Sequence, residues 1–361
     1  MSGRPASALD RAAEWGHEEV LVHRDPDSGL RCVIAIHDTT LGKAAGGTRM
    51  RLYPSLDEAA TDALRLARAM TYKSAMAEMP FGGGKAVILG DPARDKTRAL
   101  LAAYARVIDG LGGRFNTGCD LGMDERDMAV LSRLTRHVQH SPRGQRLDTA
   151  DLAALGVFES IRAAATVLGR GLEGLRVAVQ GLGNVGFQLA RRLAAGGARL
   201  TVADLDAGRV DRAVAELGAR AVDTSALYDA ETDVFSPNAA TGVLNDDTVP
   251  RLRCGAVVGG ANEQLAEPRH GDALHERGIL YGPDYVVNAG GLLSLIYDTE
   301  GADDETVIAR VRAIGPRLAS LWERAQKENV APHRMADRLA EERLAAARRH
   351  RPGNFPAVSR L

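Results

Sequence analysis

The chain has 361 residues, of which 45% are hydrophobic and 26% charged, and its formal net charge is -1 at pH 7. This composition is typical of a globular protein with two domains, and the even mixture of charges disfavours nucleic acid or a membrane surface as a partner. No apolar run approaches the roughly 20 residues that cross a bilayer, and the amino terminus lacks a secretion signal, so we expect a cytoplasmic protein. Cys32, Cys119 and Cys254 are too few and too widely spaced for a disulfide framework or a zinc site, so we expect free thiols and no metal.

The first half of the chain places two lysines next to clear structural signals. Residues 29–36 predict a strand, and residues 56–76 carry apolar side chains at helical spacing, so Lys73 is expected near the end of one long helix. Gly82, Gly83 and Gly84 precede Lys85 and a short apolar run at 86–89, which indicates a buried strand. We therefore expect the glycines to lie before this strand and to deliver Lys85 at the mouth of a sheet.

The second half of the chain has the pattern of an α/β domain. Residues 136–149 are polar and form the best candidate for a linker, and a helical pattern follows at 151–169. Strands are predicted at 175–180, 198–204, 234–235, 256–258 and 279–281, with helical stretches between them and from 304 to about 349. The fold class that we predict is α/β with two domains, the second of them a Rossmann-type, doubly wound parallel sheet.

A nucleotide fingerprint lies where the strand at 175–180 ends and a helix begins. Gly181 permits a tight turn, Gly183 lets the backbone approach a pyrophosphate, and Gly186 lets the helix pack closely on the strand. The free amides at the start of this helix, around Asn184 and Val185, are suited to phosphate oxygens. The sequence therefore predicts a dinucleotide site.

The residue that ends the next strand indicates which dinucleotide is bound. Asp204 stands where a Rossmann domain needs a carboxylate for the ribose hydroxyls, and a carboxylate repels the additional phosphate of NADP. We therefore predict NAD as the cofactor. Arg209 lies nearby and weakens this preference.

The two lysines of the first half are suited to the chemistry of an amine and a carboxylate. One lysine can hold a substrate carboxylate, and the other, if buried near a like charge, can act as a general base because its ammonium form is disfavoured. Asp120, in a glycine-containing loop, offers a carboxylate that can pair with such an amine. A single lysine is usually a solvated surface residue, but the setting of Lys73 and Lys85 argues against that interpretation.

These strings resemble the amino acid dehydrogenases of the glutamate, leucine, phenylalanine and valine group, and most closely its leucine and phenylalanine branch. The resemblance covers nearly the whole chain. It rests on Gly46-Gly47-Thr48-Arg49-Met50, Met70-Thr71-Tyr72-Lys73, Gly82-Gly83-Gly84-Lys85, Val234-Phe235-Ser236-Pro237 and Pro283-Asp284-Tyr285-Val286-Val287-Asn288-Ala289-Gly290-Gly291.

The resemblance implies a role for each matching residue. Lys73 would bind the substrate α-carboxylate, Lys85 would be the catalytic base, and Asp120 would be its partner. Gly46 and Gly47 would line the substrate. Asn288 would lie near the substrate and the nicotinamide, and Asn262 would lie on the cofactor side.

The implied reaction is the reversible, NAD-dependent oxidative deamination of an L-amino acid to a 2-oxo acid and ammonia. The implied domains are 1–141 for substrate and catalysis, with 326–361 packing back on it, and 142–325 for NAD. The resemblance also implies a homo-oligomer.

Two departures from the family pattern concern the substrate side chain. Lys43 and Ala45 stand where the family usually has a proline and a leucine, and Gly118 replaces an alanine of the leucine-specific members. Smaller residues at 45 and 118 enlarge the pocket, so we expect an aromatic or large apolar substrate, phenylalanine or tryptophan before leucine or valine.

A third departure concerns the start of the second domain. The family's Asn-Pro-Ser-Pro-x-Thr-Ala string is replaced at 148–154, and Ala153 takes the place of a threonine expected near the nicotinamide, with Thr149 close by. Two alternatives therefore stay open: a diverged member that acts on an unusual amine or oxo acid in specialised biosynthesis, and a catalytically silent NAD-binding protein.

Overall fold

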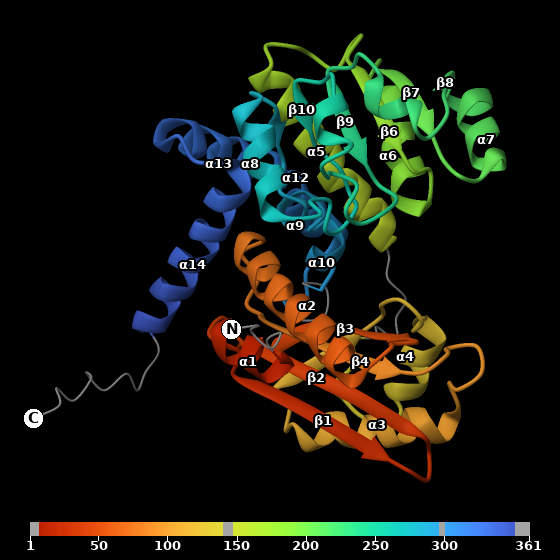
Figure 1. Cartoon of the computed structure of the whole chain (residues 1–361), viewed down its shortest axis with the longest axis vertical. Helices are drawn as coiled ribbons and strands as arrows, with labels where there is room; N and C mark the ends of the chain where they lie inside the picture. The colour runs from red at the N-terminus through yellow and green to blue at the C-terminus, as the bar shows by residue number, and fades with distance from the viewer. Residues whose placement is uncertain (1–6, 140–146, 296–299, 351–361) are drawn as a thin grey trace, which may run out of the picture. The chain divides into compact units, whose positions relative to one another are not determined.

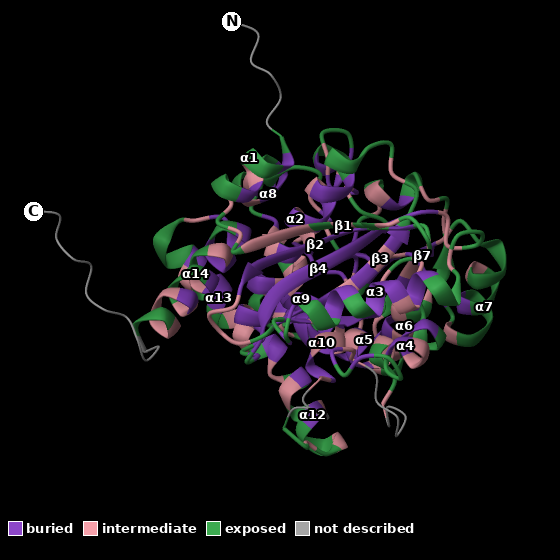
Figure 2. Cartoon of the chain, turned by 90° about the horizontal axis from the view of Figure 1, so that it is seen from below, coloured by how far each residue is buried: buried purple, intermediate pink, exposed green. Residues whose placement is uncertain are grey.

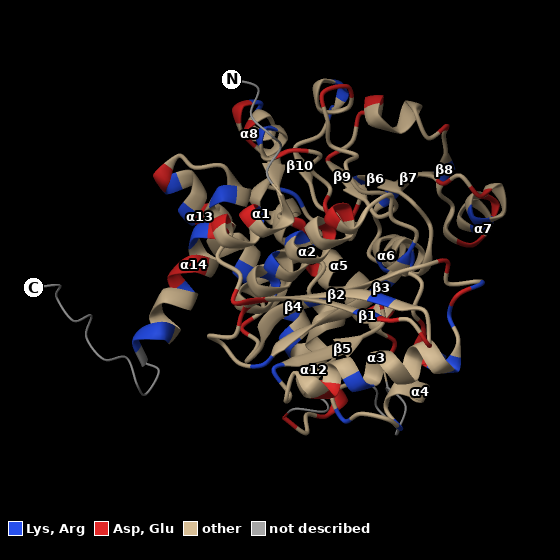
Figure 3. Cartoon of the chain, turned by 60° about the horizontal axis from the view of Figure 1, so that its bottom comes forward, with Lys and Arg blue, Asp and Glu red and all other residues tan. Residues whose placement is uncertain are grey.

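The computed structural model describes residues 7–139, 147–295 and 300–350 (Figure 1). The chain divides into two compact units: the described residues of Met1–Gly144 and Ala340–Leu361 form the first, and those of Gln145–Leu339 form the second. Among the described helices, none is long and apolar enough to cross a membrane. Charged residues of both signs alternate along helices such as α7 (Ala207–Leu217) and α14 (Pro332–His350), as Figure 3 shows.

The first unit is built on a five-stranded sheet in the order β1-β2-β4-β3-β5. Strand β2 pairs antiparallel with both β1 and β4, whereas β3 runs parallel to β4 and to β5. The strands are β1 Glu19–Asp25, β2 Leu30–Asp38, β3 Ala44–Arg51, β4 Gly82–Leu89 and β5 Phe115–Gly118. The helices are α1 Ala8–Glu14, α2 Leu56–Met76, α3 Arg98–Gly110 and α4 Glu125–Leu131.

Helices cover both faces of this sheet. Alternate residues of β2 and β4, including Val33 and Val87, pack with the alanine-rich side of α2, and their neighbours Ile34 and Ile88 pack with α3. The central strands β2 and β4 are therefore buried, and the edge strand β1 is only half-buried (Figure 2). Because side chains alternate along a strand, Lys85 lies on the α2 face, as Val87 does.

The three glycines before Lys85 are part of strand β4, so the prediction that they lie ahead of the strand is wrong. A Cβ atom added at Gly83 would lie less than 3.0 Å from the Thr71 amide nitrogen, and one at Gly84 less than 3.0 Å from the ring of Phe115. Gly83 therefore lets α2 approach the sheet closely, and Gly84 leaves room for the ring of Phe115, which extends from β5. Lys85 is therefore held within the sheet and not at its mouth.

The described ends of the predicted linker at 136–149 form part of the fold. Residues 140–146 of this stretch lie outside the described residues, but Gln139 donates its backbone N–H to the Thr117 carbonyl at 2.6 Å, and His137 is buried. Residues 136–139 thus pack along β5 because their backbone groups find partners there. At the other end, Asp148 caps helix α5 (Thr149–Val167) by accepting a hydrogen bond from the Ala150 amide.

The second unit confirms the predicted Rossmann-type fold. Its six strands are all parallel, in the order β11-β10-β9-β6-β7-β8. They are β6 Arg176–Gln180, β7 Arg199–Ala203, β8 Arg220–Ala221, β9 Val234–Pro237, β10 Ala256–Val257 and β11 Leu280–Tyr281. Besides α5 and α7, the helices are α6 Asn184–Ala195, α8 Pro268–Glu276, α9 Asp284–Val287, α10 Gly290–Leu293, α12 Asp304–Arg312 and α13 Ile314–Glu328, with short 3-10 turns at Ala226–Asp229 and Val249–Arg251.

The last turns of α14 belong to the first unit. The Tyr72 hydroxyl on α2 donates a hydrogen bond to Glu341 at 2.9 Å, and Arg343 donates to the carbonyl of Ala75 at 3.1 Å. Arg348 forms an ion pair with the buried carboxylate of Asp38. These contacts attach the last turns of α14 to α2, the helix that carries Lys73, and to the end of strand β2.

Candidate active site

The centre of the candidate site in the first unit is a buried ion pair between Lys85 and Asp120. Lys85 lies in β4 with 6% of its side chain exposed, and Asp120 follows the end of β5 with 17% exposed. The Lys85 ammonium donates a hydrogen bond to Asp120 Oδ2. The structure therefore brings together the two residues that the sequence assigned to catalysis.

Burial controls the protonation of both groups. Desolvation lowers the pKa of Lys85 below its usual value, even though the charge of Asp120 acts in the opposite direction. Burial by itself raises the pKa of a carboxyl group, but the positive charges of Lys85 and Arg49 hold the pKa of Asp120 below its ordinary value. The pair thus joins a stable carboxylate to an amine that loses its proton more easily than a solvated lysine does.

Two further charged residues, to which the sequence analysis assigned no role, extend this pair. Arg49 on β3 donates from Nε to Asp120 Oδ1 at 3.0 Å and from Nη1 to Asp62 Oδ2 at 3.1 Å. Asp62, on α2, also accepts hydrogen bonds from the Tyr53 hydroxyl at 2.7 Å and from Arg65 at 2.6 Å. No sequence spacing joins Arg49 to Asp120 or to Asp62, because these two contacts depend on how β3, β5 and α2 meet in space.

Lys73 and the paired glycines lie around the same face of the sheet. Lys73 is half-buried in the last turn of α2. A Cβ atom added at Gly46 would lie less than 3.0 Å from the carbonyl of Gly84, and one added at Gly47 less than 3.0 Å from Asp120 Cβ. Only glycine lets the β3 backbone come this close to β4 and to the Asp120 loop, which agrees with a site lined by main-chain atoms.

The two positions predicted to enlarge the substrate pocket have different surroundings. Ala45 is fully buried, and it pairs in register with Gly83 on one side and Asn116 on the other. A Cβ atom added at Gly118 would lie 2.9 Å from Oε1 of Gln139. The space left by the absent methyl group at 118 is thus occupied by the flexible end of Gln139.

In the second unit, the fingerprint glycines have the geometry of a phosphate-binding turn. Gly181 has a φ of 87°, and a Cβ atom at Gly186 would lie less than 3.0 Å from the Gly181 carbonyl, so the start of α6 lies tight against β6. Gly183 is the N-cap of α6 and offers no side-chain cap to the free amides of Asn184 and Val185. At Gly183 the nearest atom to an added Cβ is Nη1 of Arg209 at 3.8 Å, which leaves the approach to these amides open.

Asp204 immediately follows β7, as predicted, and its carboxylate is 10% exposed. It accepts hydrogen bonds from the backbone amides of Leu182 at 2.6 Å and Asp206 at 2.9 Å. Arg209 approaches Asp204 Oδ2 to 3.9 Å. The carboxylate therefore holds the fingerprint turn against the carboxyl end of β7.

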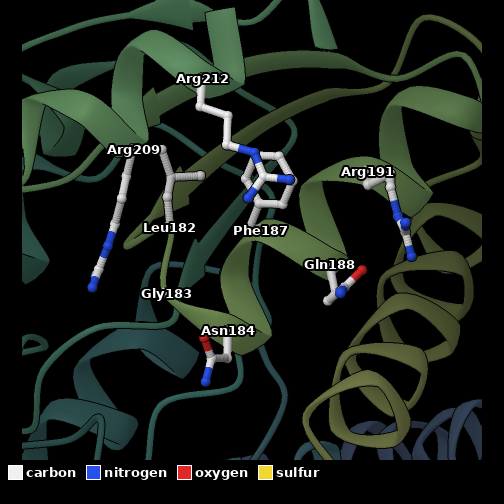
Figure 4. A pocket seen from close by; sticks show the side chains of 8 residues that line it. All are labelled: Leu182, Gly183, Asn184, Phe187, Gln188, Arg191, Arg209 and Arg212. Carbon is white, nitrogen blue, oxygen red and sulfur yellow. The ribbon is translucent and has the colours of Figure 1, made fainter. Parts of the chain in front are cut away.

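A cavity of ≈ 210 Å³ opens beside the fingerprint turn (Figure 4). In Figure 4 Arg209 and Arg212 extend from α7, whereas Phe187 and Arg191 extend from α6. The guanidinium of Arg212 lies over the ring of Phe187, 3.9 Å from its centroid. The residues that line the cavity are Leu182, Gly183, Asn184, Phe187, Gln188, Arg191, Arg209 and Arg212.

The two predicted asparagines of the second unit contact each other. The buried side chain of Asn288 donates from Nδ2 to Asn262 Oδ1 at 2.8 Å and to the Gly260 carbonyl at 3.2 Å. Ala153 lies close to Gly290, two residues after Asn288, since a Cβ atom added at Gly290 would lie 3.1 Å from the Cα of Ala153. The altered string at 148–154 therefore packs next to the segment that carries Asn288.

No group of three or more His, Cys, Asp or Glu side chains in the part of the chain that the structure describes is arranged to hold a metal ion.

Known proteins are similar to this chain in both sequence and fold. The family described as Glu/Leu/Phe/Val dehydrogenase, dimerisation domain, matches residues 17–137, and the family described as Glutamate/Leucine/Phenylalanine/Valine dehydrogenase matches residues 206–352. Leucine dehydrogenase from Geobacillus stearothermophilus is 45% identical over 341 residues, which cover 93% of each chain. Phenylalanine dehydrogenase from Thermoactinomyces intermedius is 43% identical over 336 residues, which cover 91% of this chain and 92% of that protein.

A solved structure gives the same result. The crystal structure of L-tryptophan dehydrogenase from Nostoc punctiforme superposes with a TM-score of 0.83 at 40% identity, and the match covers 94% of this chain and 99% of that one. With matches of this extent in both sequence and structure, and with the lysine–aspartate pair and fingerprint turn in place, the chain belongs to the glutamate, leucine, phenylalanine and valine dehydrogenase family of amino acid dehydrogenases.

Proposed function

We propose that this enzyme catalyses the reversible, NAD-dependent oxidative deamination of an L-amino acid to its 2-oxo acid and ammonia. The observation that carries the proposal is the buried pair of Lys85 and Asp120, in which the amine has a lowered pKa and a carboxylate partner. A group of this kind can take a proton from water and return it to nitrogen near neutral or alkaline pH. Family membership supports the same reaction class.

In the proposed mechanism the site residues of the first unit bind the substrate and transfer protons. Lys73 holds the substrate α-carboxylate as a point charge, while the backbone at Gly46 and Gly47 lines the substrate. Once the amino acid has been oxidised to an imino acid, Lys85 removes a proton from the attacking water and passes one to the departing amine. Asp120 orients the Lys85 amine and balances its charge when it is protonated.

The residues of the second unit are suited to the cofactor. The α6 amides behind Gly183 would hold the pyrophosphate, Asp204 would face the ribose, and Asn288 and Asn262 would lie on the nicotinamide side. NAD, when bound, supplies the ring that accepts the hydride from the substrate Cα. The open approach to the α6 amides supports this assignment.

We expect NAD to be preferred to NADP because the carboxylate of Asp204 repels an additional phosphate. A like-charge contact of about 2 kcal/mol corresponds to a roughly thirtyfold higher kcat/KM with NAD. Arg209 opposes this repulsion, since its guanidinium lies 3.9 Å from the Asp204 carboxylate. Arg209→Ala should therefore increase the NAD to NADP ratio of kcat/KM, while Arg253→Ala, at another exposed arginine of the second unit, should leave it unchanged. Equal use of the two cofactors by the unaltered enzyme would refute the assignment to Asp204.

We propose an aromatic or large apolar side chain for the substrate, since Ala45 and Gly118 are both small. Gln139 fills the space at Gly118, so this side chain has to move aside for a large ring. Gln139→Ala should raise the phenylalanine to leucine ratio of kcat/KM by about tenfold, a typical effect of pocket shape. Gly118→Ala should lower the same ratio, because the new methyl group meets Gln139 Oε1 at 2.9 Å.

The test of the proposed function is NADH formation at alkaline pH across the L-amino acids. Turnover that is fastest on phenylalanine or tryptophan would support both the reaction and the pocket. Turnover mainly on leucine or valine would keep the reaction and refute the pocket assignment. A complete lack of turnover would refute the proposed function.

The altered string at 148–154 favours a second candidate. Ala153 lacks the hydroxyl group expected near the nicotinamide, and it packs beside the segment of Asn288. This observation supports a diverged dehydrogenase that acts on an unusual amine or oxo acid. The retained pair of Lys85 and Asp120 argues against a silent NAD-binding protein.

The oligomeric state and the assignment of substrate and cofactor binding to the two units are also proposals. We propose that substrate binding belongs to 1–141 and 326–361 and cofactor binding to 142–325. The match of 17–137 to a dimerisation domain supports a homo-oligomer. Residence in the cytoplasm stays a prediction.

A further inference from the structure

We propose that Arg49 is a positioning residue of the reaction, which orients Asp120 toward Lys85 and is itself anchored by Asp62. The inference rests on the proposed function, since it assigns Arg49 a part in the chemistry of Lys85. Arg49, Asp120 and Asp62 are all at least four-fifths buried at their side chains, with 19%, 17% and 9% exposed. An unpaired buried ion is costly, so the buried guanidinium of Arg49 and the two carboxylates depend on one another for charge compensation.

The two carboxylate oxygens of Asp120 have different partners. Oδ2 accepts the hydrogen bond of the Lys85 amine, while Oδ1 accepts from Arg49 Nε at 3.0 Å and from the backbone amide of Leu121 at 2.5 Å. These two donors determine the rotation of the carboxylate. Without Arg49, one backbone amide alone would orient the group that holds the reacting amine.

Arg49 is itself anchored by Asp62 on α2. Its Nη1 donates to Asp62 Oδ2 at 3.1 Å, and Asp62 is held in turn by the Tyr53 hydroxyl and by Arg65. Asp62 lies on α2, the helix whose last turn carries Lys73. Arg49 therefore joins the catalytic pair on the sheet to the helix that bears the proposed carboxylate-binding lysine.

Arg49 and Asp62 also act on Lys85 through their charges. The charged groups with the largest effects on Lys85 are Asp120 after β5, Arg49 on β3 and Asp62 on α2. Arg49 lowers the pKa of Lys85, whereas both carboxylates raise it. On the remaining neighbour, β2, His37 bonds to Thr71, and burial keeps it neutral by lowering its pKa to about 4. Arg49 thus favours the uncharged amine and Asp62 opposes it.

The opposite signs of these two effects provide the test. The pH dependence of kcat is measured on one amino acid for the unaltered enzyme and for Arg49→Met, Arg49→Lys and Asp62→Asn. Because Lys85 acts as the neutral amine, activity rises with pH through its pKa. Arg49→Met should move this rise to higher pH by about one pH unit, which lowers kcat roughly tenfold at a fixed pH on the rising limb. Asp62→Asn should move it downward, and Arg49→Lys, which keeps the charge, should restore it to near the original position.

A matched control separates this role from a structural one. Arg106→Met removes an exposed arginine of the same unit, paired with Asp25 at 3.4 Å, and should leave the pH profile unchanged. If Arg49→Met and Asp62→Asn lower kcat without moving the profile, or move it in the same direction, the inference is overturned.

A measurement without turnover distinguishes this inference from the proposed function. The pH dependence of Lys85 carbamylation by cyanate, followed by mass spectrometry, reports the neutral amine directly. The same opposite shifts in an enzyme that lacks turnover would support the positioning of Asp120 by Arg49 and would refute only the proposed reaction. Unchanged carbamylation profiles in an active enzyme would refute only the role of Arg49.

Discussion

Lys85→Met is expected to lower kcat by about a thousandfold, within the range for loss of a general acid–base group. Methionine fills the buried space of the lysine but can neither donate nor accept a proton. Asp120 keeps its hydrogen bonds from Arg49 and Leu121, so the loop should hold its place. The affinity for NAD should be unchanged, because the fingerprint residues belong to the second unit. Steady-state turnover and NAD titration by fluorescence measure the two quantities.

Lys96→Met is the matched control for this prediction. Lys96 also pairs with an aspartate of the first unit, Asp127, at 2.7 Å, and it donates to the carbonyl of Gly122 at 2.9 Å. The loss of this pair should reduce stability without a large change in kcat. If both variants lost turnover equally, Lys85 would have no special chemical role.

Gly83→Ala is expected to destabilise the first unit by about 3 kcal/mol, the upper part of the usual range for overpacking. The added methyl group would lie less than 3.0 Å from the amide nitrogen and hydroxyl of Thr71 and from the carbonyl of Ala67. These are atoms of α2, mostly backbone, so the helix has to move away from the sheet. For a unit of this size the melting temperature should fall by roughly 6 to 12 °C, which calorimetry measures.

Gly110→Ala provides the comparison for Gly83. Gly110 ends α3, it is exposed, and an added Cβ atom there has no neighbour within 4 Å. Alanine should therefore be neutral or slightly stabilising at 110. If the Gly83→Ala and Gly110→Ala proteins have the same melting temperature, the close approach of α2 to the sheet does not depend on Gly83.

The parts of the fold with a strong local period were predictable from sequence. Helix α2 was predicted at 56–76 and forms at Leu56–Met76, since a serine N-cap at Ser55 and a continuous apolar face act together. The strand before the fingerprint and the strand before Asp204 are predicted to within about one residue, because each is a short apolar run bounded by turn signals. These elements carry the predicted nucleotide site.

Strands β3 and β5 escaped prediction because their sequences lack a strand-like pattern. Gly46 and Gly47 in β3 and Gly118 in β5 are residues of low strand propensity. The two glycines of β3 lie where backbones approach closely, whereas Gly118 lies against the side chain of Gln139. The contact between Arg49 and Asp120 depends on both strands and spans 71 residues of sequence. A pairing of this kind follows from strand register and not from a motif.

The measurement that tests the central claim most directly is the ratio of ammonia released to NADH formed on the best L-amino acid substrate. Oxidative deamination predicts one ammonia for each NADH, with the 2-oxo acid as the remaining product, and loss of both in Lys85→Met. NADH formation without release of ammonia would contradict the account, because the substrate would then be oxidised without the water attack that Lys85 is proposed to promote.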